Sequence, residues 1–199
     1  MHVASTGMSG DPGGDGLKMA LRRLVVSGCS GGGKTSLINE LKGRGQRVIP
    51  EAGRIIVQEQ MASGGHALPW DNRLAFALKL AAMASQQYHS VIGFDGDTFF
   101  DRSLIEVEVF CDLHDLPLPR AYQSFADTCR YDDPIFLAAP WQAIFNRDAE
   151  RQHGFEEAVL EYNALQQKFL EKGYQVLVIP RDATVKRADW ILNMMNDLD

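Results

Sequence analysis

The chain has 199 residues, of which 45% are hydrophobic and 23% are charged, and its formal net charge is -6. This composition is ordinary for one globular domain with a substantial core, and the acidic balance argues against a nucleic-acid partner, which normally requires a basic face. No apolar run approaches the roughly 20 residues that span a bilayer, so we expect no membrane partner. The three cysteines show no metal-ligand spacing, and their odd number is typical of a reducing, cytoplasmic location.

Strand-like and helix-like patterns alternate along the chain after a glycine-rich start. Residues 1–18 are predicted to form a tail without fixed structure, and 19–199 a single domain. Short apolar runs bounded by turn residues predict strands at 24–27, 47–50, 98–100, 134–137 and 175–179. Helical spacing of apolar residues predicts helices near 37–41, 53–61, 71–88, 155–169 and 188–195, with a helical region interrupted by prolines in the middle of the chain.

The longest predicted helix illustrates the basis of these assignments. Asp71 is a plausible N-cap, and Leu74, Leu78, Ala81 and Tyr88 recur at helical spacing after it. Strands that alternate with crossover helices predict an α/β fold with three layers and a mostly parallel five-stranded sheet. In such sheets, ligands bind at the carboxyl edge of the strands.

A glycine-rich loop, GCSGGGKT at residues 28–35, joins the first strand to its helix. It fits the phosphate-binding pattern G-x-x-x-x-G-K-[ST] at every fixed position, and a chance glycine-rich turn is the alternative. Glycines let backbone N–H groups converge on phosphate oxygens, Lys34 can reach the terminal phosphates and Thr35 can bind Mg²⁺. The loop therefore predicts ATP and Mg²⁺ as cofactors, bound by Gly28, Ser30, Gly31, Gly32, Gly33, Lys34, Thr35 and Ser36.

Acidic and basic residues follow two further strands at the same edge of the sheet. Asp101 ends the third strand and is the predicted second partner of Mg²⁺, with Asp95 and Asp97 as nearby alternatives and a solvated strand-end aspartate as the plainer interpretation. Glu51 follows the second strand and, with Arg54 one turn later, is predicted to act on the substrate as a general base beside an anchoring arginine. A helix-start glutamate with a surface arginine is the alternative.

A basic pair follows the fourth strand. Arg147 and Arg151 lie four positions apart, so on a helix they would share one face and could together stabilise a transferring phosphate. A solvated face paired with neighbouring acids is the alternative. We predict both arginines to be catalytic, in a lid segment near 141–156.

These motifs, in this order, resemble the nucleoside- and nucleotide-kinase branch of P-loop NTPases. The resemblance rests on GCSGGGKT, PEAGR, FFDR, RDAER and the Pro180–Arg181 turn, and runs from Arg22 to the C-terminus. The chain is most similar to AAA-type predicted ATPases whose relatives include ribosylnicotinamide kinase domains. The resemblance implies that Glu51 or Asp101 is the base, that the two lid arginines move, and that residues 181–185, including Arg181, contact adenine.

The chain departs from this family at the third strand, which ends in Asp-Arg-Ser where deoxynucleoside kinases commonly have Glu-Arg-Ser. The identity of the acceptor therefore does not transfer from the resemblance. Trp70 lies in the loop where such kinases build the acceptor pocket, and it either stacks on a ring of the substrate or packs at the rim or in the core.

The predicted function is transfer of the γ-phosphoryl group of ATP to a small, nucleoside-like acceptor with a hydroxyl group. Lys34, Arg102, Arg147 and Arg151 would supply positive charge, and Arg102 would also contact the substrate. An ATPase or a nucleotide-dependent switch that acts on a protein partner is the alternative. The absence of an N-K-x-D motif in the sequence disfavours a GTPase.

Overall fold

The computed structural model describes residues 20–126, 128–145 and 154–197. Its sheet contains five parallel strands in the order β2-β3-β1-β4-β5. The strands are β1 (Arg22–Gly28), β2 (Arg47–Ile49), β3 (Asp97–Asp101), β4 (Ile135–Ala138) and β5 (Val176–Ile179). This arrangement confirms the predicted α/β fold, with each predicted strand in place.

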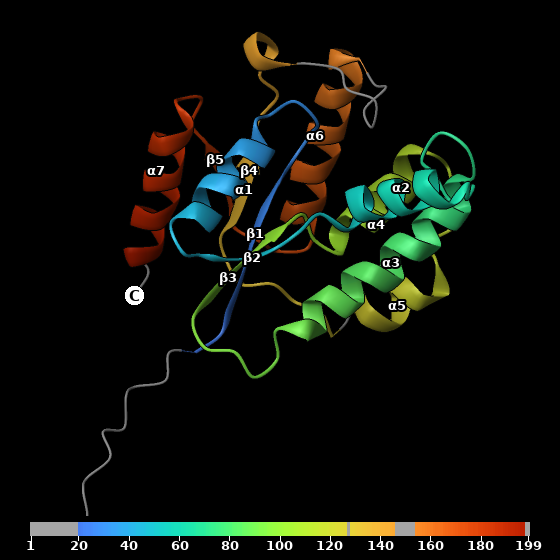
Figure 1. The fold of residues 1–199 in the computed structure, drawn as a ribbon, viewed down its shortest axis with the longest axis horizontal. Helices are drawn as coiled ribbons and strands as arrows, with labels where there is room; N and C mark the ends of the chain where they lie inside the picture. Colours follow the sequence, from blue (N-terminus) through green and yellow to red (C-terminus); the bar gives the residue numbers. More distant parts are fainter. Residues whose placement is uncertain (1–19, 127, 146–153, 198–199) are drawn as a thin grey trace, which may run out of the picture.

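The α-helices are α1 (Lys34–Gly43), α2 (Ala52–Ser63), α3 (Arg73–Ser90), α4 (Ile105–Leu113), α5 (Arg120–Ala126), α6 (Phe155–Glu171) and α7 (Thr184–Asn196), and a 3₁₀ turn, η1, covers Gln142–Ile144. Figure 1 shows α1 and α7 together on one side of the sheet and the remaining α-helices on the other. The connection from β1 to β2 runs along the sheet in the direction opposite to the later connections. Right-handed crossovers therefore place its helix on the opposite face from α2 to α6.

Both faces of the sheet are buried, and successive strand residues alternate between them. Leu24 and Val26 of β1 pack in the core beneath α1 and α7, whereas Val25 packs in the larger core beneath the other helices. Phe99 and Phe100 of β3 divide in the same way. A strand covered on both faces needs apolar residues at every position, which explains why the strands read as uninterrupted apolar runs.

The long helix α3 differs from its prediction in its cap and its buried face. Asn72 rather than Asp71 is the N-cap, because the Asn72 side chain accepts a hydrogen bond from the Ala75 N–H at 3.0 Å. Leu74 and Leu78 are exposed. Ala81 and Tyr88 are buried, as their spacing predicted, and the rest of the buried face consists of Phe76, Ala77, Leu80, Ala84 and Ser85. The apolar side chains of α3 itself are distributed around much of its circumference, so spacing alone did not identify the whole of its buried face.

In the described part of the chain, none of the helices combines the length and hydrophobicity that crossing a bilayer requires.

Candidate functional site

The glycine-rich loop lies at the carboxyl end of the central strand β1, between β3 and β4. Gly28, Gly31 and Gly33 have φ values of 128°, 78° and 73°, in the left-handed region that favours glycine. A Cβ added to Gly28 would lie 2.3 Å from the Ala138 carbonyl oxygen, so no larger residue fits there. Helix α1 begins directly after Gly33 without a side-chain cap. Its first N–H groups are therefore available to an anion.

Lys34 is buried at the start of α1 and folds back over the loop. Its ammonium group donates hydrogen bonds to the carbonyl oxygens of Gly28, at 2.7 Å, and Cys29, at 2.9 Å. Burial, together with the positive charge of Arg102, lowers the pKa of Lys34, although nearby carboxylates oppose the shift. Thr35 and Ser36 follow on the exposed start of the helix. The two hydrogen bonds hold the Lys34 ammonium against the first residues of the loop.

Asp101 ends β3 and pairs in register with Val26 of β1, which places it beside the loop. Its Oδ1 atom is buried and has no hydrogen-bond partner among the described residues. Burial and the charge of Glu51 raise the pKa of Asp101 to about 6, against the opposing effects of Lys34 and Arg102. A buried carboxylate oxygen that lacks a donor fits a cation. Thr35 and Asp101 both carry side-chain oxygen atoms, the kind of ligand that Mg²⁺ prefers.

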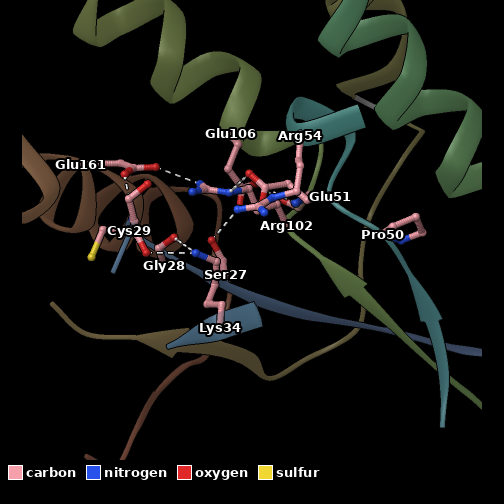
Figure 2. Close-up of polar contacts among 12 residues, drawn as sticks. Ser27, Gly28, Cys29, Lys34, Pro50, Glu51, Arg54, Arg102, Glu106 and Glu161 are labelled. Atoms are coloured by element: carbon pink, nitrogen blue, oxygen red, sulfur yellow. Dashed lines mark hydrogen bonds and ion pairs between the residues drawn. The ribbon is translucent and has the colours of Figure 1, made fainter. Parts of the chain in front are cut away.

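Arg102 connects three parts of the site. Its backbone has a φ of 75°, unusual for a residue with a side chain, and its N–H donates to the Val26 carbonyl oxygen at 3.1 Å. Its guanidinium lies 3.0 Å from a carboxylate oxygen of Glu51 and donates to Glu161 at 2.8 Å. Figure 2 shows these two carboxylates on either side of Arg102. Burial alone would lower the pKa of Arg102, but Glu161 and Glu51 outweigh it and raise the pKa, so the side chain stays cationic.

Glu51 is the residue immediately before α2, and Arg54 lies one turn later in the helix. One carboxylate oxygen of Glu51 lies 3.9 Å from Nε of Arg54 while the other faces Arg102. Figure 2 shows Glu51, Arg54 and Arg102 together. Asp101 lines the same cavity as these three residues, so the predicted grouping is present at one edge of the sheet.

Two glutamates, the buried Glu106 and the partly buried Glu161, complete the site and were not identified from the sequence. Glu161 of α6 accepts hydrogen bonds from Arg102 and from the Ser30 N–H of the loop, the latter at 3.3 Å. Glu106 of α4 accepts from the Ser27 hydroxyl at 2.5 Å and from the backbone and hydroxyl of Ser103. Glu106 thereby joins the ends of β1 and β3. In the sequence both look like ordinary helix glutamates, because their partners lie far away along the chain.

A cavity of about 510 Å³ opens beside this group of charges. Ser30 of the loop and the acidic residues line it, while Phe76 and Phe110, with ring centroids 5.2 Å apart, belong to its apolar part. Trp70 is not among the residues that line this cavity in the described chain, and it packs half-buried against the core. The lining also includes Glu51, Arg54, Asp101, Arg102, Tyr131 and Glu161.

A second, more open hollow of about 630 Å³ lies where β4 and β5 end, and its lining includes Pro140, Tyr162 and Arg181. The Arg181 guanidinium donates to the Pro140 carbonyl oxygen at 2.7 Å. Arg147 and Arg151 lie outside the described residues, as does the part of the predicted lid at 146–153, so their roles stay predictions. The described residues contain no group of three or more metal-binding side chains.

The fold and the glycine-rich loop together define a P-loop NTPase. The family described as "AAA domain" matches residues 23–187, and the chain belongs to that family. No curated protein matches the chain.

The similar solved structures include several kinases. Deoxyadenosine kinase from M. mycoides, with products dCMP and a flexible dCDP bound, is 16% identical, with a TM-score of 0.61 over 88% of this chain and 99% of that one. NadR in complex with NR is 15% identical, with a TM-score of 0.65. The match covers 88% of this chain and 51% of the NadR chain, so this chain spans about half of NadR. Shikimate kinase from Acinetobacter baumannii, in complex with shikimate, is 12% identical, with a TM-score of 0.56 and coverage of 90% and 95%. At these identities the likeness shows the fold alone.

Proposed function

We propose that the protein is an ATP-dependent phosphotransferase that acts on a small, nucleoside-like acceptor. One observation carries the proposal: the loop and the cavity meet at Glu51, Asp101 and Arg102, with Ser30 of the loop in the lining of the cavity. An acceptor in the cavity would therefore lie next to a nucleotide held by the loop. Catalysis would consist mainly of positioning the two substrates and of neutralising charge.

Each residue has a defined task in this proposal. Lys34 binds the terminal phosphates once it exchanges its two carbonyl partners for phosphate oxygens, and Arg102 adds positive charge where the phosphoryl group is transferred. Thr35 and Asp101 would hold Mg²⁺, which neutralises phosphate charge when it is bound. Glu51 accepts the proton of the acceptor hydroxyl, with Arg54 beside it to orient the acceptor.

The shape and lining of the two hollows support the choice of ligands. The cavity beside Glu51, Asp101 and Arg102 combines aromatic rings with carboxylates and guanidinium groups, as expected for a flat ring that carries a hydroxylated sugar. The hollow beside Arg181 is the candidate position for adenine. The similar solved structures hold dCMP as a product, NR or shikimate, so this fold accommodates small hydroxyl-bearing molecules.

The cysteines support a cytoplasmic location. Cys29, Cys111 and Cys129 are all free and buried. Free thiols are typical of a reducing compartment.

The decisive experiment measures ADP release from MgATP in the presence of nucleosides, NR, nucleoside monophosphates and sugars. The controls are a reaction without acceptor and the Lys34→Ala variant. An acceptor-specific increase, lost in Lys34→Ala, is the expected result and identifies the class of substrate. Equal release with and without acceptor would contradict the kinase and favour an ATPase or a switch that acts on a protein partner.

A further inference from the structure

Arg187, on the first turns of α7, is buried directly behind the phosphate-binding loop with only 3% of its surface exposed. Its guanidinium donates to the carbonyl oxygens of Gly32, at 3.0 Å, and Gly33, at 3.3 Å. A Cβ added to Gly33 would lie 2.6 Å from this guanidinium. The arginine and the glycine therefore fit closely against each other, and the sequence motif says nothing about the arginine.

The charge of Arg187 has no carboxylate partner among the described residues. Burial alone lowers its pKa, with no compensating acid, and its Nε atom is buried without a hydrogen-bond partner. Arg44 also binds α7, but it is paired with Asp189 at 2.6 Å. Burying a cation without a counter-charge raises the free energy of the folded state. Because Arg187 lies beside a loop of the phosphate-binding type, we expect an anion bound at the loop to offset this cost in the functional complex.

The two hydrogen bonds also fix the orientation of the loop. A trans peptide group is planar, so its C=O and N–H point in opposite directions. Because Arg187 binds the carbonyl oxygens of Gly32 and Gly33, the N–H groups of Gly33 and Lys34 point away from α7. These are the amides that a loop of this type turns toward phosphate.

We infer that Arg187 is a positioning residue for the nucleotide phosphates: it orients two loop amides and supplies uncompensated positive charge behind them. The inference rests on the proposed function only in that the loop binds a nucleotide. It assigns a task to a residue of α7 that belongs to no recognised motif of the sequence.

The test compares MgADP and Mg-pyrophosphate binding, by calorimetry, in the full chain and its variants. Arg187→Met should weaken both ligands by about 10- to 100-fold, because the loss of charge-assisted hydrogen bonds acts on the phosphates. Arg187→Lys, which keeps the charge but not the fork, should fall between Arg187→Met and wild type. Ethylguanidinium added to Arg187→Ala should restore part of the affinity. Arg44→Met is the matched control, since it cuts another link to α7 without touching the loop, and should bind both ligands as wild type does.

Thermal melting of each variant without ligand separates a general loss of structure from the inferred role. If Arg187→Met does not fold, the test relies on Arg187→Lys and on the rescue of Arg187→Ala by ethylguanidinium. Wild-type affinity in Arg187→Met, or in Arg187→Lys and Arg187→Ala without added guanidinium, would overturn the inference and leave the proposed function standing. So would an equal loss of affinity in Arg44→Met. A wild-type chain that binds neither ligand would overturn both.

Discussion

The proposed site has a phosphate end, at the glycine-rich loop, and an acceptor end, at the cavity beside Arg102. Different chemical groups form these two ends. At the phosphate end the groups that face a ligand are backbone amides, held in place by glycines with positive φ and by the start of α1. At the acceptor end they are side chains from α2, α3, α4 and α6, oriented by ion pairs such as those of Arg102 with Glu51 and Glu161. A backbone site depends on a short, continuous stretch of chain, whereas a side-chain site depends on the whole fold.

This difference implies that damage at the two ends should have different signatures. Loss of a charged group at the phosphate end should reduce catalysis without much loss of stability. Arg102 links the two ends, and loss of its charge should deprive Glu51 and Glu161 of a shared cation in a largely enclosed site, so that both stability and activity fall.

The largest expected effect is at the phosphate end. Lys34→Ala should lower kcat for phosphoryl transfer by about a thousandfold, because it removes a preorganised positive charge from the transferring group. Steady-state kinetics with saturating MgATP would measure this loss. Lys42→Ala, an exposed lysine at the other end of the same helix, should leave kcat unchanged. A kcat within a few fold of wild type in Lys34→Ala would show that the loop is not catalytic.

Substitution of Arg102, which links the two ends, should lower both stability and activity. Arg102→Met should lower the free energy of unfolding by about 1–3 kcal/mol, since it removes the cation that Glu51 and Glu161 share in a partly buried site. Urea denaturation would measure the change, with Arg120→Met as the control, because Arg120 is exposed at the start of α5. Equal stability of the two variants would contradict the structural role of Arg102.

Replacement of Asp101 should raise the free energy of unfolding by an amount that depends on pH. Its pKa is about 6 in the folded protein and 3.8 in the reference state, so the ionised side chain destabilises the fold. The penalty is absent below the reference pKa, grows as pH rises between the two values and is complete above the folded pKa. Without Mg²⁺, Asp101→Asn should therefore be more stable than wild type by up to about 3 kcal/mol near pH 7.5, and by much less near pH 4.5.

Thermal melting of both proteins in EDTA, at the two pH values, would measure this difference. The same variant should lose Mg²⁺-dependent nucleotide binding. A stability difference that does not change with pH would mean that the environment of Asp101 does not raise its pKa.

The smallest expected effect concerns the apolar part of the acceptor cavity. Phe110→Leu should raise KM for the acceptor by about 3- to 10-fold with little change in KM for ATP, since it removes a ring from the cavity wall. Trp70→Phe is the comparison, because Trp70 lies outside the lining. A larger rise in Trp70→Phe than in Phe110→Leu would restore the stacking role that the sequence suggested for the tryptophan.

Local signals in the sequence were sufficient for the fold and for the phosphate loop. Each strand was found from its apolar run, and GCSGGGKT places the loop without further information. The cap of α3 was wrong by one residue, because Asp71 and Asn72 are equally good caps and Asp71 is instead in contact with His66 at 2.8 Å.

The rest of the site depends on contacts between distant parts of the chain. Glu106 binds Ser27 from 79 positions away, and Arg187 binds Gly32 from 155 positions away. No periodicity or motif distinguishes these side chains from solvated ones on the same helices. Glu51, Asp101 and Arg102 were accessible to prediction because each follows a strand that ends at the same edge of the sheet.

The hydrogen bonds of Lys34 also bear on the affinity for a nucleotide. Lys34 donates two hydrogen bonds, to the carbonyl oxygens of Gly28 and Cys29, and so ties the start of α1 to the end of β1. A phosphate group that takes over the Lys34 ammonium would replace both of these bonds. The net enthalpy gained at this lysine is therefore smaller than it would be for an ammonium group that only water solvates.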